Sequence, residues 1–309
     1  MLTFEKLDKN NKEEWNNFVD KTPNGRFEHK TDFIDFLEKN KGNLESFLIK
    51  ENNKLIATIS LFKENIFLFK RYSSQGIVTK ENINVRKIIK ELIKKTGKAT
   101  YIRINKLNAK VKKTVPETFI LNIKDKTIKE IFNKELESRA RRAIKKAERN
   151  NLKLKISNSK EELKKFYPIY QNKMKEFKSK ESSLDSLKKL MKNKNYSLFN
   201  VYSKDKVIAG GTMMIYKNMI TNHLAASDKN YLEFAPNNFL YYNMIKFAKE
   251  KNLEIVNYGP SLKTDRVAKF KESMGGKPIG FEEHIILNKL PYSLFKLLSY
   301  ILLKIKKII

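Results

Sequence analysis

The chain has 309 residues, with 65 Lys and Arg against 34 Asp and Glu, a formal net charge of +31 and no Cys. This length allows one large domain or two of ordinary size, with ample apolar material for a core. The absence of Cys excludes disulfide bonds, iron–sulfur clusters, Cys-ligated zinc and a thiol nucleophile. The three His residues (His29, His223 and His284) are far apart in the sequence, so no metal site is expected.

Most of the basic residues are Lys, since only nine of the 65 are Arg. A genome rich in A and T favours Lys codons and explains this composition as well as selection for an anionic partner does. A surface of this charge attracts polyanions and anionic lipids, and salt weakens both attractions. The first residues contain no apolar stretch typical of a signal peptide, so we expect a cytoplasmic protein.

The first part of the chain alternates helical and strand patterns, which is typical of a mixed α/β domain. Apolar spacing predicts helices at 13–20, 31–40 and 82–96. Strands are predicted at 46–50, 54–62, 66–69, 99–104 and 118–123.

One long amphipathic helix is predicted at 128–150. Its apolar stripe repeats at helical spacing from Leu136 to Ala147. The opposite face is basic and carries Arg139, Arg141, Arg142, Lys145, Lys146 and Arg149.

The remaining elements repeat the order of the first part. They are predicted strands at 153–156, 197–203, 207–216, 220–226 and 254–258, and helices at 160–177, 184–192 and 237–251. A repeated order without sequence identity indicates a duplicated α/β lobe. We therefore expect an N-terminal lobe at 1–134 and a C-terminal lobe at 135–289.

The segment 290–309 differs in character from the rest. Its uncharged stretch is shorter than the roughly 20 residues that cross a membrane. At helical spacing it has one face of Leu and Ile and one face with Ser and Lys. This pattern predicts a helix lying on an anionic membrane surface, with a helix docked on the protein's own core as the alternative.

Several common catalytic motifs are missing from the sequence. It contains no GxxxxGK[ST], GxGxxG after a strand, GxSxG or HExxH pattern, so no bound nucleotide cofactor or metal is expected. His223 lies within a predicted strand and is interpreted as a structural residue.

The segment from Tyr258 to Gly276 has the richest combination of residues. A strand is expected to end at Tyr258, Gly259-Pro260 to break it, and a short helix to carry Phe270 and Lys271. Such a loop between a strand end and a helix is a common place to bind an anionic or carbonyl group. The alternative is that Lys271 is one more solvated Lys.

Four motifs in this chain stand in the order and spacing found in the Fem-type transferases. They are Arg-x-x-Arg-Ala-x-x-x-Ala at 139–147, Pro236-Asn237 opening a helix, Tyr258-Gly259, and Phe270-Lys271-x-x-x-Gly275. Over roughly residues 10–288 the chain thus resembles the peptidoglycan-bridge aminoacyl transferases and their acetyltransferase-like relatives in the GNAT superfamily.

The resemblance implies two GNAT-like lobes, and transfer of an amino acid from aminoacyl-tRNA to an amine of a cell-envelope precursor, soluble or lipid-linked. It implies that Lys271 stabilises the reacting ester, and Asp265 and Glu282 are the candidate proton acceptors. The implied substrate-binding residues are Phe270, Tyr258, Gly259, Asn237 and Arg266. The expected contacts to tRNA or phosphate are Arg139, Arg142, Lys145 and Lys146.

Two alternatives to this activity remain open on the sequence. One is an acyl-CoA-dependent N-acyltransferase acting on an envelope glycan or lipid. In acetyl-CoA-dependent GNAT enzymes a Gln/Arg-x-x-Gly-x-Gly/Ala loop binds the CoA pyrophosphate, and in this chain Ala235-Pro236-Asn237-Asn238 stands in its place. The other is a non-catalytic GNAT-like protein that binds RNA or membrane. With 290–309 as a surface anchor, we expect a peripheral protein on the cytoplasmic face of the membrane.

Overall fold

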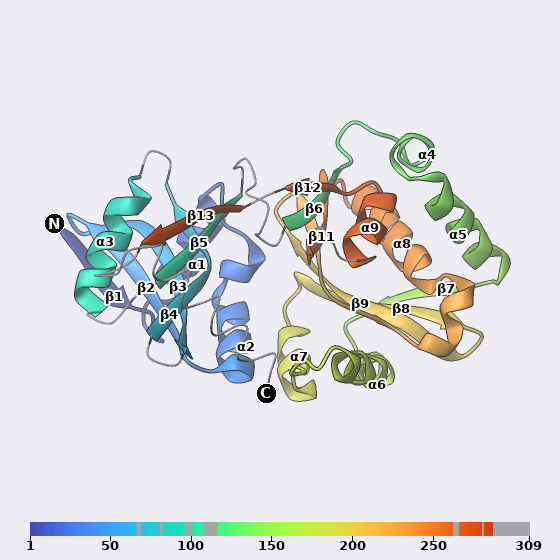
Figure 1. Ribbon diagram of the computed structural model, residues 1–309, viewed down its shortest axis with the longest axis horizontal. Coiled ribbons are helices and arrows are strands. Elements are labelled where there is room, and N and C mark those ends of the chain that lie inside the picture. The colour runs from blue at the N-terminus through green and yellow to red at the C-terminus, as the bar shows by residue number, and fades with distance from the viewer. Residues whose placement is uncertain are drawn as a thin grey trace. The chain divides into compact units, whose positions relative to one another are not determined.

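The computed structural model describes residues 1–66, 69–80, 83–96, 101–107, 117–261, 266–279 and 281–286 (Figure 1). The chain forms two compact units, Met1–Lys106 with Glu282–Ile309, and Leu107–Phe281. The predicted terminal helix at 290–309 lies outside the described residues. In the described part of the chain, no helix has the length and apolarity needed to cross a membrane.

The first unit is a six-stranded sheet with helices on both faces (Figure 1). In sheet order its strands are β1 (Leu2–Lys6), β2 (Leu44–Glu51), β3 (Lys54–Ile66), β4 (Phe69–Thr79), β5 (Tyr101–Leu107) and β13 (Phe281–Ile286). Its helices are α1 (Lys12–Lys21), the short η1 (Phe27–His29), α2 (Thr31–Lys41) and α3 (Val85–Thr96). Helix α3 buries the stripe Val85, Ile88, Ile89 and Leu92 against the sheet, as its spacing predicts.

The second unit is a seven-stranded sheet of the same design. In sheet order its strands are β12 (Lys277–Ile279), β6 (Glu117–Asn122), β11 (Ile255–Ser261), β10 (Met219–Ser227), β9 (Lys206–Tyr216), β8 (Tyr196–Ser203) and β7 (Lys153–Ser157). Its helical segments are α4 (Ile128–Glu130), η2 (Ile131–Glu135), α5 (Ser138–Arg149), α6 (Lys160–Glu176), α7 (Leu184–Leu190), η3 (Lys229–Phe234), α8 (Pro236–Glu250) and α9 (Arg266–Ser273). Helices α6 and α7 cover one face and α8 the other (Figure 1).

The two sheets share one strand order, which confirms the predicted duplication of an α/β lobe. Strands β1 to β5 in the first unit correspond to β7 to β11 in the second. In each unit two central neighbours are parallel, and the described pairs are 71–73 with 101–103 and 219–221 with 255–257. Among the described residues, β10 and β11 form no ladder pairs after Thr221 and Asn257, and we call the region that follows these pairs the splay.

The unit boundaries differ from those expected at 134/135 and 289/290. Strand β6 pairs antiparallel with β11, which places residues 117–134 in the second unit. Strand β13 joins the sheet of the first unit, so the second boundary falls before Glu282. Pairings between strands so distant in sequence leave no trace in local periodicity.

The continuous helix predicted at 128–150 is wrong. The backbone is extended at Leu136 and Glu137, and α5 begins only at Ser138. The break is stabilised from two sides: Glu137 N donates to Ser273 O at 2.9 Å, and Arg141 Nη1 donates to the carbonyls of Asn133 (3.1 Å) and Leu136. Strands β1, β12 and β13 were not predicted. Of the strand expected at 66–69, Ile66 ends β3, Phe69 begins β4, and residues 67 and 68 lie outside the described residues.

Candidate active site

The splay between β10 and β11 is lined by irregular backbone on both strands. The register shifts between Asn222 and Leu224 in β10 and between Asn257 and Pro260 in β11. Gly259 has φ +79°, and a Cβ there would lie 3.2 Å from Asn222 O. A side chain at this position is therefore strained. The break expected at Gly259-Pro260 is in fact a bulge through which β11 continues to Ser261.

Lys271 binds the end of β11 rather than solvent. Its side chain is buried, and Nζ donates to Gly259 O (3.0 Å), Pro260 O (2.9 Å) and Ser261 Oγ (2.9 Å). These three acceptors match the three N–H groups of an ammonium. The interpretation of Lys271 as a solvated residue is wrong, because the ammonium fixes one edge of the splay.

Two further buried residues shape the same strand end. Asn257 Oδ1 accepts hydrogen bonds from Thr118 Oγ1 (2.6 Å) and from Gly259 N (2.9 Å). Tyr258 donates its hydroxyl to Met274 O at 2.8 Å, and burial raises the pKa of this phenol. Tyr258 is therefore a neutral donor that ties β11 to the end of α9.

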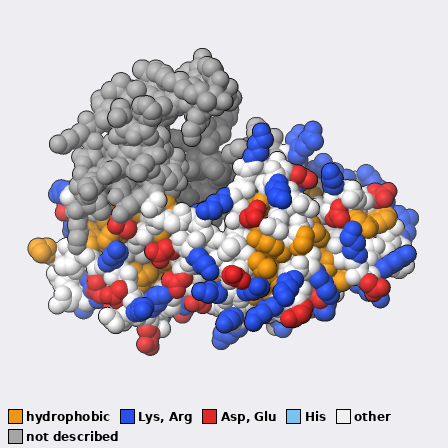
Figure 2. All heavy atoms as spheres, turned by 90° about the horizontal axis from the view of Figure 1, so that it is seen from below, with side chains coloured by type: hydrophobic (Ala, Val, Ile, Leu, Met, Phe, Trp, Pro, Cys, Tyr) orange, Lys and Arg blue, Asp and Glu red, His pale blue; other side chains and the backbone are white. Residues whose placement is uncertain are grey.

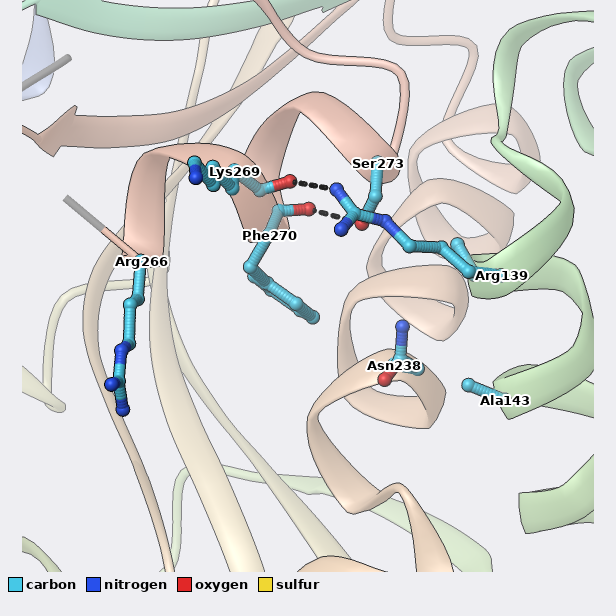
Figure 3. A pocket seen from close by; sticks show the side chains of 8 residues that line it. Arg139, Ala143, Asn238, Arg266, Lys269, Phe270 and Ser273 are labelled. Atoms are coloured by element: carbon cyan, nitrogen blue, oxygen red, sulfur yellow. Dashed lines mark hydrogen bonds between the residues drawn. The ribbon is translucent and has the colours of Figure 1, made fainter. Parts of the chain in front are cut away.

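A pocket of about 400 Å³ opens between α5, the start of α8 and α9 (Figure 3). It is lined by Arg139, Ala140, Ala143, Asn238, Arg266, Lys269, Phe270 and Ser273. Three of these side chains are cationic and none is acidic. The lining thus combines apolar residues with cationic ones, which suits an anionic ligand with an apolar part.

The walls of the pocket are fixed by contacts between its own residues. Arg139 Nη2 donates to Lys269 O at 2.8 Å, and its Nε pairs with Glu137 at 2.7 Å. Ser273 Oγ donates to Phe270 O at 2.7 Å (Figure 3). The Phe270 ring packs edge-to-face on Tyr241 at 5.1 Å between centroids. Helices α5, α8 and α9 are therefore linked around one cavity.

The structure brings the sequence-predicted residues together in two groups. Arg139, Arg266 and Phe270 line the pocket. Tyr258, Gly259 and Lys271 meet at the end of β11.

The other predicted residues are placed differently. Asn237 Nδ2 donates to Ser227 Oγ at 3.1 Å, and its neighbour Asn238 lines the pocket instead. Arg142, Lys145 and Lys146 lie on the exposed side of α5. Asp265 lies outside the described residues, as does the side chain of Glu282, so neither has a described place at the site.

Five pocket residues were missed in the sequence: Ala140, Ala143, Asn238, Lys269 and Ser273. Ala140 and Ala143 were assigned to an apolar stripe, and their small size also leaves room for the cavity. Lys269 and Ser273 flank Phe270 on the same helix, but only the fold shows which face of α9 meets α5.

Figure 2 shows one face of the molecule, on which Lys and Arg side chains are spread widely among acidic and hydrophobic ones. Within the described residues, no group of three or more His, Asp or Glu is placed to hold a metal ion.

Residues 134–271 match the acetyltransferase (GNAT) domain family. Three solved structures share the fold over almost their whole length. FemX is 16% identical with a TM-score of 0.69, covering 95% of this chain and 99% of FemX. L-PGS from Bacillus licheniformis is 15% identical, TM-score 0.64, covering 96% and 98%. A tandem GNAT protein from the clavulanic acid biosynthesis pathway is 8% identical, TM-score 0.58, covering 93% and 98%.

Among proteins with curated descriptions, none matches the chain in sequence. Residues 134–271 are nevertheless a GNAT acetyltransferase domain, which makes the protein an acyltransferase, and the chain shares its two-lobe fold with FemX and L-PGS. This confirms the class and the two-lobe fold that the four sequence motifs indicated.

Proposed function

We propose that the protein transfers an aminoacyl group from aminoacyl-tRNA to an amine of a cell-envelope precursor. The observation that carries this proposal is the pocket with three cations and Phe270 beside the splay. The 3′ end of a charged tRNA offers phosphates for the cations and a base for an aromatic side chain. An acceptor in the envelope is supported by the Fem-type motifs of the sequence together with the fold shared with FemX and L-PGS.

The second candidate donor is an acyl-CoA. It is favoured by the match of residues 134–271 to the acetyltransferase (GNAT) domain family. Against it, the backbone before α8 has no Gly-rich loop: the turn contains Ala235 in the left-handed region (φ 56°), followed by Pro236, which has no N–H to donate.

The deciding experiment offers both donors to the purified protein. Total charged tRNA or a set of acyl-CoAs is incubated with a lipid-linked envelope precursor extract, and the products are identified by mass. We expect a product only from charged tRNA, with an added mass that identifies the amino acid. A product only from acyl-CoA supports the second candidate, and no product from either contradicts both.

We expect the exposed face of α5 to bind the tRNA backbone. The triple variant Arg142→Glu, Lys145→Glu, Lys146→Glu should weaken tRNA binding by roughly 10–100-fold and lower the slope of log K against log salt by about 3. Arg139 is left unchanged because it bonds to Lys269 O. Binding is measured by fluorescence anisotropy over a salt series.

The matched control reverses the same number of charges on another helix. Lys160, Lys164 and Lys175 are exposed on α6, and their replacement by Glu changes the net charge equally. If the control weakens binding as much as the α5 variant, net charge and not the α5 face governs tRNA binding.

We propose that residues 290–309 hold the protein on the cytoplasmic face of the membrane through their Lys and apolar faces. Deleting 291–309 is expected to move the protein from the membrane fraction to the soluble fraction, and to abolish binding to vesicles with anionic lipid. High salt should reproduce part of this loss in the full chain. An unchanged distribution after deletion contradicts the anchor.

A further inference from the structure

We propose that His223 accepts the proton of the attacking amine, and that Tyr196 and Thr212 position its imidazole. This inference rests on the proposed acyl transfer and supplies the proton acceptor that the reaction needs. The sequence had suggested a merely structural histidine at this position.

His223 is the extra residue of the β10 bulge. Its neighbours Asn222 and Leu224 pair with Met213 and Thr212 on β9, and the register shifts by one residue between them. The last pair between β10 and β11 is Thr221 with Asn257, two residues earlier. The histidine therefore lies where the splay opens.

The bulge around His223 is held on both sides. Asn222 Nδ2 donates to Leu224 O at 3.1 Å, and Asn222 Oδ1 accepts from Tyr241 OH at 3.1 Å. A Cβ at Gly211 would lie 2.8 Å from Leu224 O. A Cβ at Gly259 would in turn lie 3.2 Å from Asn222 O. The carbonyl oxygen of Gly259 accepts a hydrogen bond from Lys271. His223 and Lys271 thus belong to the two edges of one splay.

A chain of two short hydrogen bonds sets the tautomer of His223. Tyr196 OH donates to Thr212 Oγ1 at 2.7 Å, and the same Tyr196 oxygen is 2.7 Å from His223 Nδ1. Since the single phenol proton goes to Thr212, Nδ1–H of His223 donates to Tyr196. The lone pair is then on Nε2, which is the form of imidazole that accepts a proton.

The surroundings keep this arrangement in place. Tyr196 is fully buried, which raises the pKa of its phenol, and its ring packs edge-to-face on His223 at 5.8 Å. Two other phenols face this region, Tyr170 of α6 through its interaction with Tyr196 and Tyr241 of α8 through its hydrogen bond to Asn222. The Glu162 carboxylate of α6 is bound to Tyr202 and Asn200, and the Lys271 ammonium of α9 to the end of β11.

The proposed reaction has two stages, and one proton is transferred in each. The amine nitrogen forms a bond to the ester carbonyl carbon, and the carbonyl electron pair moves to oxygen. The ammonium proton passes to His223 Nε2. When the intermediate collapses, the bond from carbon to the ribose oxygen breaks, and that oxygen takes the proton from the imidazolium.

The test is the pH dependence of transfer by the purified full chain with charged tRNA. Wild-type kcat/KM for the acceptor is expected to rise with pH through the imidazole range, about 6 to 7. His223→Gln should lose this rise and lower kcat by about 10²–10⁴-fold, with KM for the donor unchanged. Tyr196→Phe should lower kcat less, because it keeps the imidazole and removes only its hydrogen-bond partner.

His29 in the first unit is the matched control. It is also buried, and its Nδ1 accepts from Arg26 N at 3.1 Å. His29→Gln is expected to keep the wild-type rise. A His223→Gln variant that keeps both the rise and at least a third of the wild-type kcat overturns the inference and leaves the proposed function standing. Failure of the wild type to transfer from any donor overturns the proposed function itself.

A second measurement needs no variant and no substrate. Nitrogen-15 NMR of the wild-type imidazole is expected to show His223 protonated at Nδ1 near pH 8, with Nε2 taking the second proton on acidification. Protonation at Nε2 alone would overturn the proposed role whether or not transfer is observed.

Discussion

Replacing Lys271 with Met is expected to lower kcat by about 10²–10³-fold and the free energy of unfolding by about 2–4 kcal/mol. Met fills a similar volume but leaves the carbonyls of Gly259 and Pro260 without their buried donor. The end of β11, one edge of the splay, then loses its anchor to α9. Steady-state kinetics and urea denaturation measure the two effects.

This expectation differs from a purely electrostatic role for Lys271. All three N–H groups have acceptors in the protein, so direct contact with an oxyanion requires one of these bonds to be released when substrate binds. In the geometry observed, Lys271 is a positioning residue. Lys277→Met, an exposed position on β12, is the control and should leave both measurements unchanged. A stable Lys271→Met variant with near wild-type kcat would contradict both roles.

Replacing Glu162 with Gln is expected to lower the free energy of unfolding by roughly 3 kcal/mol at pH 7, at about 1.36 kcal/mol per pKa unit. The Glu162 carboxylate is only 3% exposed and binds two Lys, Lys155 (2.9 Å) and Lys165 (3.0 Å). It also accepts from Tyr202 OH (2.5 Å) and Asn200 Nδ2 (3.0 Å). Burial alone would raise the pKa of Glu162, but these partners outweigh burial and lower it from 4.5 to about 2.

The stabilisation by the Glu162 carboxylate depends on pH. The pKa is lower in the folded state than in the unfolded state, so the stabilisation is fully present above pH 4.5 and is lost as pH falls towards 2. The difference in unfolding free energy between wild type and Glu162→Gln should therefore shrink over that range. Urea denaturation at a series of pH values measures it.

Glu176→Gln on the same helix is the control for Glu162. Glu176 is 47% exposed and pairs with Lys173 at 2.9 Å, a surface ion pair that contributes little. A Glu162→Gln variant that is no less stable than this control would contradict the prediction.

Much of the fold could be predicted from local patterns. Helix α8 begins with Pro236 at its first turn, and α3 repeats apolar residues at helical spacing, so both were predicted to within a few residues. The failures are of another kind. Strands β12 and β13 were not predicted, and β6 was predicted as a strand but assigned to the first lobe, because all three owe their places to partners far away in sequence. The break at Leu136 depends on a bond from Glu137 to Ser273.

Part of the candidate site could likewise be predicted from local patterns, and part could not. Tyr258, Phe270 and Lys271 were predicted because their motif is short and local. The pocket was not, since it needs α5, α8 and α9 together. Nor was the bond between Tyr196 and His223, which are 27 positions apart on strands that are not neighbours in the sheet. The alternation of polar and apolar residues predicts which face of a sheet a residue lies on, but it does not predict the direction of a side chain at a bulge.

Because strand β13 belongs to the sheet of the first unit, that sheet becomes complete later in synthesis than the sheet of the second unit. Strand β13 completes the first unit, yet the ribosome synthesises it after every strand of the second. An emerging chain thus carries β5 as an unpaired edge until residue 286 has been made, and such an edge readily pairs with other chains. The second unit has all its strands by residue 279 and is the first whose sheet is complete.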